Sequence, residues 1–333
     1  MNNLKALKKA LRQIANQVGA DTGGGGASGP RAGAGMGRKA VRKGHGGAGA
    51  LLAAAAMGSS SLADAGPVAG PVLVPVAPGG VIEDTVVYKQ TPRGPLQLHV
   101  YLPATPAPPG GRACVVFFHG GGWRRGSTNQ FRLFSAMLAQ HGVIGMSAEY
   151  RLLETEERMI PTEAIEDARS ALRYVRKYAS RFGCDPARIG AGGGSAGGHL
   201  AMMTAVKSPV EDPHDDLTID PKPQALIVLN GPVNFDDYQA AIPVEERRKY
   251  APYYLLDKTF PPTLMMHGTS DKVIPITQIV AFREKAATMG VNVKLVAFEG
   301  RGHGFFNKGK GQPGDWERAS TEMLAFLRGL GWI

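Results

Sequence analysis

From Val81 onward the chain alternates short apolar runs with longer segments in which apolar residues recur every three or four positions. Continuous apolar runs predict strands buried on both faces of a parallel sheet, and the longer spacing predicts amphipathic helices. The expected strands are a hairpin-like pair at Val81–Lys89 and Leu96–Tyr101, followed by Cys114–His119, Val143–Ala148, Ile189–Gly192, Ala225–Asn230, Thr263–His267 and Val293–Phe298.

The expected helices lie between these strands. Ala164, Ala168, Leu172 and Val175 belong to a long amphipathic segment that continues to Phe182 and ends at Gly183. Further helices are expected at Ala196–Val206, Gln278–Met289 and Trp316–Leu330. This alternation predicts an α/β protein with a doubly wound, mostly parallel sheet flanked by helices.

The first 80 residues have a different texture, which divides the chain into a basic low-complexity tail (1–80) and a folded domain (81–333). The tail begins with a short basic amphipathic helix around Leu4–Val18, followed by Gly- and Ala-rich sequence from Thr22 to Gly49. Such sequence cannot bury enough apolar surface to order itself. The fold is therefore expected to consist of residues 81–333.

Part of the tail has the outline of a secretory signal. The basic stretch Arg38–Lys43 precedes the modestly apolar Ala48–Met57, and Ala63-Asp64-Ala65 offers a cleavage site, with Met36 as a possible start. The alternative is a disordered extension on a cytoplasmic enzyme. The sequence leaves secretion or a periplasmic location and the cytoplasm equally open.

The net charge of +10 belongs mostly to this tail. Residues 1–65 hold nine Lys/Arg and two Asp/Glu, which leaves the rest of the chain at only +3. We therefore expect no nucleic-acid partner. No apolar run approaches the roughly 20 residues of a membrane span, so no transmembrane segment is expected.

The cysteines and histidines indicate no metal or cofactor. Cys114 and Cys184 have no metal-ligand spacing; we do not expect them to pair, although spacing alone does not decide this. There is no His-Glu-x-x-His pattern and no dinucleotide-binding fingerprint. We expect no metal site and no cofactor.

One motif predicts nucleophilic chemistry. Gly193-Gly194-Ser195-Ala196-Gly197 lies between an expected strand and an expected helix, as in the G-x-S-x-G nucleophile elbow. A serine needs a base to take its proton, and a third group must orient that base. Asp271 and His303 follow in the order Ser…Asp…His, each just after an expected strand. We predict Ser195 as nucleophile, His303 as base and Asp271 as the orienting acid.

Other residues compete for these roles. His119 and His267 end expected strands and are expected to be structural, and His199 is expected to pack behind the site. Glu299 is a rival acid, but it is only four residues from His303 in the same loop.

A second glycine motif supplies candidate oxyanion donors. His119-Gly120-Gly121-Gly122-Trp123 follows a strand, and backbone without side chains approaches a ligand closely. The expected oxyanion hole consists of the N–H groups of Gly121, Gly122 and Ala196. Trp123 either lines the acyl pocket or supports the loop. The next two residues, Arg124 and Arg125, are expected to form a solvated rim rather than a clamp for an acid.

These motifs, with Glu149-Tyr150-Arg151-Leu152 and Asp185-Pro186-Ala187-Arg188-Ile189, resemble the α/β-hydrolase superfamily from about Val81 to Ile333. The closest branches are the carboxylesterases related to hormone-sensitive lipase and the bifunctional acetylxylan/feruloyl esterase-like group. The resemblance implies an α/β-hydrolase fold.

Two departures favour the second branch. Hormone-sensitive-lipase-like enzymes commonly have aspartate where this chain has Gly194, and Asp271-Lys272-Val273-Ile274-Pro275 is similar to the acetylxylan/feruloyl group and to prolyl-oligopeptidase-like hydrolases. A small lid is expected at about Val233 to Phe260. It contains four tyrosines that would contact an aromatic or sugar group or simply pack, namely Tyr238, Tyr250, Tyr253 and Tyr254.

The resemblance and the motifs together predict a serine carboxylesterase that acts on short acyl esters through an acyl-enzyme. The substrate is expected to be a small-molecule or carbohydrate-linked ester, including acetyl or feruloyl esters of plant polysaccharide. The alternatives are a prolyl-oligopeptidase-like serine peptidase and a non-catalytic binding protein on the same fold. The sequence does not indicate the natural ester or the oligomeric state.

Overall fold

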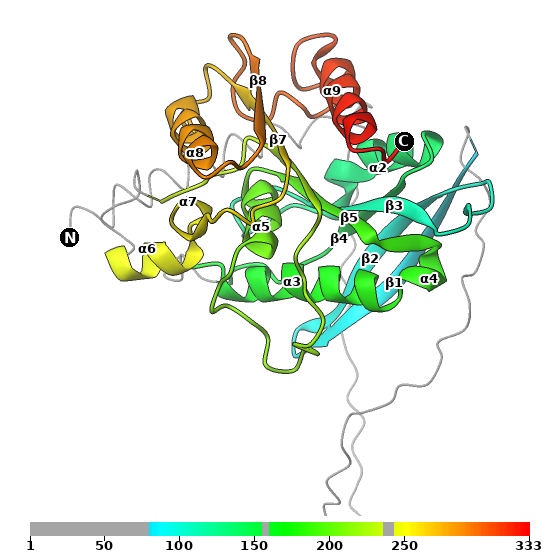
Figure 1. The fold of residues 1–333 in the computed structure, drawn as a ribbon. Coiled ribbons are helices and arrows are strands. Elements are labelled where there is room, and N and C mark those ends of the chain that lie inside the picture. The colour runs from blue at the N-terminus through cyan, green and yellow to red at the C-terminus, as the bar shows by residue number, and fades with distance from the viewer. Residues whose placement is uncertain (1–79, 155–159, 236–242) are drawn as a thin grey trace, which may run out of the picture. The chain divides into compact units, whose positions relative to one another are not determined.

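The structure is a computed structural model that describes residues 80–154, 160–235 and 243–333. In these residues eight strands form one sheet, in the order β1-β2-β4-β3-β5-β6-β7-β8 (Figure 1). The strands are β1 (Val81–Thr91), β2 (Gly94–Pro103), β3 (Arg112–Phe118), β4 (Ile144–Ala148), β5 (Cys184–Gly194), β6 (Ala225–Leu229), β7 (Thr263–Gly268) and β8 (Val293–Phe298). β1 and β2 pair antiparallel with each other, and β2 pairs antiparallel with β4. The remaining pairs are parallel, as the sequence predicts.

Helices cover both faces of the sheet. The helical elements are the 3₁₀ turn η1 (Thr128–Phe131), α2 (Arg132–Gln140), α3 (Thr162–Lys177), α4 (Ala179–Phe182), α5 (Ala196–Ala205), α6 (Val244–Tyr250), α7 (Pro252–Leu255), α8 (Ile276–Thr288) and α9 (Asp315–Gly329). The buried apolar residues of α3, α5 and α8 belong to one hydrophobic cluster, and those of α9 belong to another with Phe134, Met137 and Leu138 of α2. No helix in the described ranges is long and apolar enough to span a membrane.

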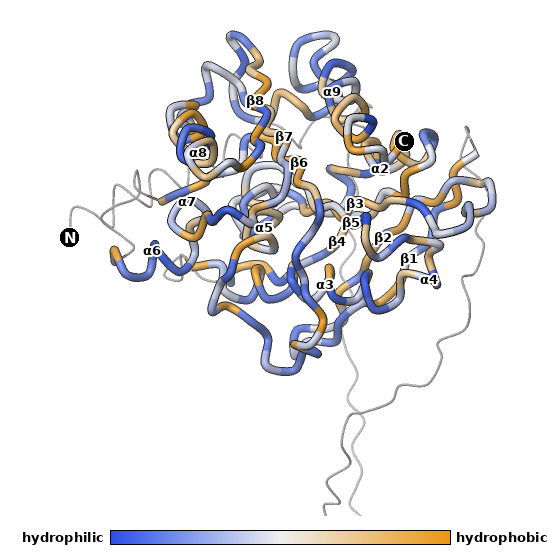
Figure 2. Tube along the Cα trace, viewed as in Figure 1, coloured by the Kyte–Doolittle hydropathy of each residue, from blue (hydrophilic) through white to orange (hydrophobic). Residues whose placement is uncertain are grey.

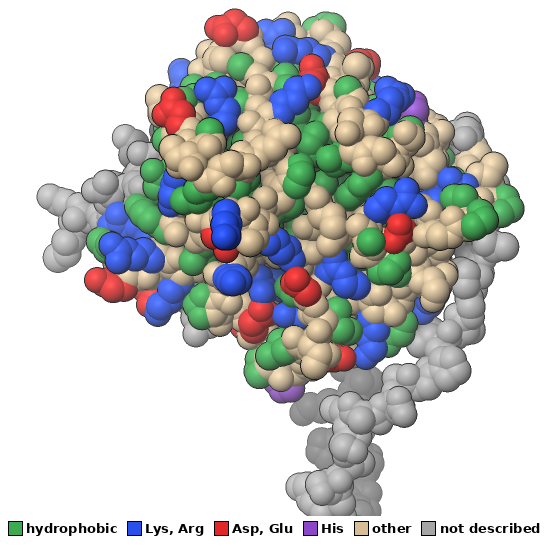
Figure 3. Space-filling view, in the orientation of Figure 1, with side chains coloured by type: hydrophobic (Ala, Val, Ile, Leu, Met, Phe, Trp, Pro, Cys, Tyr) green, Lys and Arg blue, Asp and Glu red, His purple; other side chains and the backbone are tan. Residues whose placement is uncertain are grey.

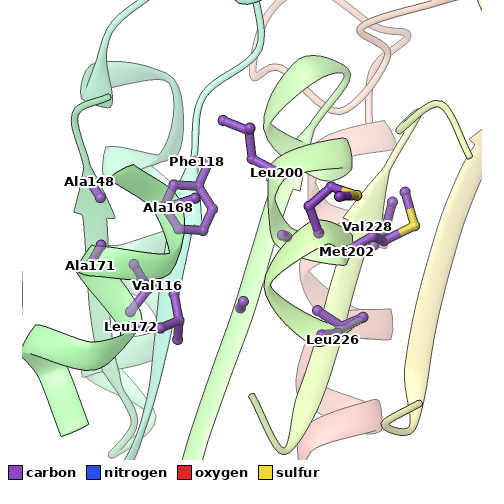
Figure 4. Packing of buried hydrophobic residues seen from close by; sticks show 14 of the residues in the cluster. Val116, Phe118, Ala148, Ala168, Ala171, Leu172, Leu200, Met202, Leu226 and Val228 are labelled. Carbon is purple, nitrogen blue, oxygen red and sulfur yellow. The ribbon is translucent and has the colours of Figure 1, made fainter. Parts of the chain in front are cut away.

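Successive side chains of the central strand β3 point alternately into the two clusters. Val116 and Phe118 pack with α3 and α5, as Figure 4 shows, whereas Val115 and Phe117 pack with α2 and α9. All four side chains are fully buried. Strand β6 is likewise hydrophobic along its length, as is the middle of β7 at 264–266, and both strands are buried throughout (Figure 2). A parallel sheet covered on both faces explains why these segments are continuous apolar runs.

The structure departs from the sequence prediction in three elements. The long helix expected to run to Phe182 is broken at Tyr178 (φ −109°, ψ 28°), which separates α3 from α4 before the left-handed Gly183 (φ 69°). Strand β5 begins at Cys184 rather than Ile189, because Cys184 pairs with Arg112 of β3. Helix α2 was not predicted, although Phe134 and Leu138 mark its buried face at helical spacing.

Two further details bear on the predictions. The expected lid holds the short helices α6 and α7, and Tyr238 lies outside the described residues. Cys114 and Cys184 are both buried and free. On the face of the molecule in Figure 3, Lys and Arg side chains are interspersed with Asp and Glu.

Charged side chains fix α3 to β1 and to the segment that follows α5. Lys89 Nζ lies 2.8 Å from Asp167 Oδ1 and 2.6 Å from Asp212 Oδ2. Arg151 holds the same Asp167 carboxylate through Nε and Nη2, at 2.8 and 2.7 Å. Asp167 is fully buried, and these two cations compensate its carboxylate.

The network makes stability depend on pH. Burial raises the pKa of Asp212, but the hydrogen bonds from Lys89 and His214 outweigh it and leave the pKa well below its ordinary value. A carboxyl group whose pKa is depressed in the folded state stabilises the fold above its unfolded pKa of about 3.9. This stabilisation is lost as the pH falls below that value toward the folded pKa.

We predict that Lys89→Met lowers the free energy of unfolding by about 3–5 kcal/mol at pH 7, because it leaves two buried carboxylates short of a cation. The difference from wild type should shrink below about pH 4, where wild type loses the contribution of ionised Asp212. Urea unfolding at several pH values measures both effects. Lys294→Met is the matched control, since Lys294 pairs with Glu322 at the surface and should contribute about 1 kcal/mol or less. Equal losses in the two variants would contradict the account.

Candidate active site

Ser195 lies at the sharp turn between β5 and α5. Its backbone has φ 52° and ψ −120°, an uncommon conformation for a residue with a side chain. The Ser195 N–H donates to the carbonyl of Leu229 on β6 at 2.8 Å, which ties the turn to the neighbouring strand. Strain of this kind persists only where the surrounding structure over-determines it.

The glycines around Ser195 are required by close packing. A β-carbon on Gly197 would lie 1.9 Å from the carbonyl oxygen of Phe118, and one on Gly193 would lie 2.4 Å from the carbonyl carbon of Gly197. Contacts this short do not occur, so larger residues are excluded at both positions. A β-carbon on Gly194 would lie 2.4 Å from the Phe306 ring. That ring occupies the space an aspartate would need, which explains the departure from hormone-sensitive-lipase-like sequences at this position.

The structure brings the three predicted triad residues into one line of hydrogen bonds. His303 Nε2 lies 2.9 Å from Ser195 Oγ, and His303 Nδ1 lies 2.8 Å from Asp271 Oδ2. Ser195 follows β5, Asp271 follows β7 and His303 follows β8, so the carboxyl ends of the parallel strands bring these distant residues together. With Nδ1 protonated toward the carboxylate, Nε2 is free to accept the serine proton.

Backbone and side-chain donors surround the Asp271 carboxylate. Oδ1 accepts the N–H groups of Val273 and Ile274 at 2.8 and 3.0 Å, and Oδ2 accepts the amide of Asn230 as well as His303. Burial raises the pKa of Asp271, but the hydrogen bond and charge of His303 outweigh it, so the net pKa is lowered. Asp271 is therefore ionised at neutral pH.

The loops of the acid and the base are bonded to each other. The N–H of Ser270 donates to the Arg301 carbonyl at 2.9 Å, and the N–H of Gly300 donates to Thr269 Oγ1 at 2.8 Å. Gly268 allows this contact, because a β-carbon there would lie 2.2 Å from the Arg301 carbonyl oxygen. The distance between Asp271 and His303 is thus set by backbone contacts on either side.

None of the rival histidines bonds to Ser195 among the described residues, although His267 Nε2 lies 3.5 Å from Asp271 Oδ2. His267 Nε2 donates to the carbonyl of Ile274 at 2.9 Å, and His199 Nε2 donates to that of Tyr250 at 2.6 Å. His119 stacks on Tyr150, with ring centroids 4.3 Å apart. Burial lowers the pKa of His267, and it lowers the pKa of both His119 and His199 to about 4. All three are neutral at pH 7. The rival acid, Glu299, is exposed.

The glycine loop after β3 is held next to Ser195. The N–H of Gly120 donates to Gln130 Oε1 at 2.6 Å, and Gln130 Nε2 donates to Asn307 Oδ1 at 3.0 Å. Gly121 and Gly122 both have positive φ, 124° and 62°. In the part of the chain that the structure describes, no partner accepts the N–H groups of Gly121, Gly122 or Ala196. These donors are available to a ligand.

Trp123 packs beside the helix that carries Ser195. Its ring meets that of His199 edge-on at 5.2 Å and that of Phe235 at 5.9 Å, and its backbone has a positive φ of 59°. Only 8% of the residue is exposed. The contact with His199, one turn after Ser195, shows that Trp123 supports this side of the site.

The sequence reasoning missed two positioning residues, Asn230 and Gln130. Asn230 directly follows β6 and has φ 49°, so it stands at the same sheet edge as the triad. Its place after an apolar run and before Gly231 was the available signal. Gln130 lies in η1, and nothing in its sequence context indicates the bond to Gly120.

Among the described residues, no group of three His, Cys, Asp or Glu side chains is placed to hold a metal ion.

We predict that Gly197→Ala destabilises the protein by at least about 3 kcal/mol, at the upper end of the cost of overpacking, because the clash is with backbone. Gly329→Ala is the matched control. A β-carbon at Gly329 meets nothing within 4 Å, and alanine in a helix should be neutral or stabilising by up to about 1 kcal/mol. Thermal unfolding of both variants measures the difference. A Gly197→Ala protein as stable as wild type would show that the turn is looser than described.

Sequence comparisons agree with this geometry. The BD-FAE family model matches residues 98–286, more than half of the chain. A probable isoprenylcysteine alpha-carbonyl methylesterase of Arabidopsis thaliana is 25% identical over 67% of this chain and 51% of that protein. Esterase LipC of Mycobacterium tuberculosis is 26% identical over 61% of this chain and 54% of that protein. The chain thus spans about half the length of these curated relatives.

A solved structure is similar over nearly its whole length. Esterase 2 of the planctomycete Thermogutta terrifontis has a TM-score of 0.70 and 34% identity, over 77% of this chain and 94% of that one. Structures of the same esterase phosphorylated by paraoxon and bound to propionate or butyrate match equally well. The sheet order, the helices on both faces and these matches all indicate the same fold. The chain belongs to the BD-FAE family of α/β-hydrolase-fold esterases.

Proposed function

We propose that this protein hydrolyses short-chain acyl esters through an acyl-enzyme intermediate, with Ser195 as nucleophile, His303 as base and Asp271 as orienting acid. The observation that carries the proposal is the unbroken chain of hydrogen bonds from Ser195 Oγ through both nitrogens of His303 to Asp271. It gives the serine a base within 2.9 Å and gives that base a fixed tautomer.

In the first half of the reaction, Ser195 Oγ attacks the ester carbonyl carbon while His303 Nε2 takes its proton. The resulting imidazolium faces the ionised Asp271, which stabilises it without taking the proton. Collapse of the tetrahedral intermediate breaks the bond to the alcohol. His303 gives its proton to the departing alkoxide, and the acyl group stays on Ser195.

The oxyanion of the intermediate needs donors fixed before the reaction. We assign this role to the N–H groups of Gly121, Gly122 and Ala196, which donate to no other group among the described residues. Ala196 is also the first residue of α5, where the helix dipole favours negative charge. One such donor is worth roughly 2.7–4 kcal/mol in the transition state.

In the second half, water takes the place of the alcohol. His303 removes a proton from that water, which attacks the acyl carbon, and the same oxyanion donors hold the second intermediate. The proton returns to Ser195 Oγ as the carboxylic acid leaves. The enzyme is then restored without metal or cofactor taking part in any step that these residues perform.

Several observations support short acyl groups. Ser195 is only 7% exposed, and Trp123 packs closely beside its helix. Esterase 2 of Thermogutta terrifontis has been solved with propionate and with butyrate bound.

The BD-FAE match and the sequence resemblance to acetylxylan and feruloyl esterases support acetyl or feruloyl groups on plant polysaccharide as substrates. The possible export signal lies outside the described residues, and an exported and a cytoplasmic enzyme stay equally open.

The hydrolysis profile of wild type and Ser195→Ala tests the proposal. The panel runs from p-nitrophenyl acetate to decanoate, with acetylated xylan and methyl ferulate. We expect wild type to prefer the short esters and Ser195→Ala to lose activity on the order of 10⁶-fold with an unchanged thermal midpoint. Turnover by folded Ser195→Ala close to that of wild type would contradict the assigned nucleophile.

Asp271→Asn tests the acid. An asparagine amide can donate to Nδ1, which fixes the proton on Nε2 and blocks general-base action; the same change in a serine protease costs about 10⁴-fold in kcat. We expect a loss of that order on p-nitrophenyl acetate. Glu299→Gln is the control, and activity should stay near wild type because Glu299 is exposed. The reverse pattern would show that Glu299 is the acid.

A further inference from the structure

Arg124 and Arg125 immediately follow the glycine loop, and one edge of each guanidinium group is buried rather than solvated as the sequence predicts. Both residues are only partly exposed. The Nε and Nη2 atoms of both side chains are buried and have no hydrogen-bond partner. Buried donors left without an acceptor are costly, and charged donors more so.

The unpartnered atoms are the same pair in both side chains. Nε–H and Nη2–H lie side by side on one edge of a guanidinium and form a fork that matches the two oxygens of a carboxylate. This chain shows that use of the fork elsewhere: Arg151 holds Asp167 through Nε at 2.8 Å and Nη2 at 2.7 Å. Arg124 and Arg125 therefore present two forks with no anion from the described residues.

Both arginines are attached to the loop that we assign to the oxyanion. The N–H of Arg124 donates to the Gly121 carbonyl at 3.2 Å. A β-carbon on Gly121 would lie 3.3 Å from Arg125 Cγ, so the stem of Arg125 passes directly over Gly121. On the same loop, a β-carbon on Gly120 would lie 3.3 Å from Ser195 Cβ. The backbone of Arg124 and the stem of Arg125 are thus fixed to the loop that adjoins Ser195.

We propose that Arg124 and Arg125 form an anion subsite that selects esters bearing a free carboxylate. The inference rests on the ester-hydrolase function proposed above and adds a substrate class to it. The carboxylate belongs to the acyl part, as in a half-ester of a dicarboxylic acid, or to the alcohol part, as in an ester of a hydroxybenzoate. Since residues 66–333 carry a net charge of only +3, the selection arises from these two side chains rather than from the net charge of this part of the chain.

Matched substrate pairs test the subsite. Mono-p-nitrophenyl glutarate against p-nitrophenyl pentanoate places the charge on the acyl side, and 4-acetoxybenzoate against its methyl ester places it on the alcohol side. We expect wild type to favour the anionic member of one pair by about tenfold or more in kcat/KM, the scale of a charge-assisted hydrogen bond. In Arg124→Gln/Arg125→Gln that ratio should fall toward one.

Two further variants distinguish recognition of the carboxylate by the guanidinium fork from the effect of charge alone and from a loss of folding. Arg124→Lys/Arg125→Lys keeps both charges without the fork and should recover only part of the ratio. Arg328→Gln removes one charge at the exposed end of α9 and should leave the ratio unchanged. Equal loss on anionic and neutral esters in the glutamine variant would assign the arginines a structural role and overturn the subsite. So would a wild-type ratio near one in both pairs.

Binding tests the subsite independently of turnover. Glutarate should bind wild type, by calorimetry, at least about tenfold more tightly than neutral glutaramide. This difference in affinity should disappear in the glutamine double variant. If that variant does not fold, the difference in wild type should become smaller when salt is added. Wild type that binds neither compound would overturn the subsite. An enzyme that binds glutarate but hydrolyses no neutral ester would contradict the proposed function while leaving the subsite in place.

Discussion

The backbone conformation of Ser195 is the constraint on which the rest of the site depends. At φ 52° the chain reverses between β5 and α5 in a single residue, which exposes Oγ at the sheet edge. This turn requires Gly197 to lie against Phe118 and Gly193 to lie against Gly197, at distances that no side chain allows. Packing therefore requires glycine at both positions, and the turn between them exposes the side chain of Ser195.

The same turn organises the electrostatics of the site. It places the N–H of Ala196 at the start of α5, and Ser195 itself lies against Gly120 of the loop after β3. It also places Oγ where His303 reaches it, while Asp271 is held by two backbone N–H groups and the amide of Asn230. Donors and charges are thus fixed before a substrate arrives, which is the condition for stabilising a developing charge at little cost in reorganisation.

Much of this arrangement could be predicted from the sequence, because it follows from order along the chain and from the geometry of parallel strands. Ser195, Asp271 and His303 each follow an apolar run, and the carboxyl ends of such strands meet at one edge. Contacts that depend on side-chain placement could not be predicted in this way. The hydrogen bond between Gly120 and Gln130 and the burial of Nε and Nη2 of Arg124 and Arg125 arise from the path of the loop, which no periodicity encodes.

The most direct test of the central claim is the site at which paraoxon reacts. An activated serine displaces p-nitrophenolate from paraoxon and keeps the diethylphosphoryl group, and esterase 2 of Thermogutta terrifontis has been solved in a form phosphorylated by this compound. Mass spectrometry of the inactivated wild type should find one diethylphosphoryl group, on the peptide that contains Ser195, in proportion to the activity lost. Loss of activity with Ser195 unmodified would contradict the assignment of Ser195 as the nucleophile.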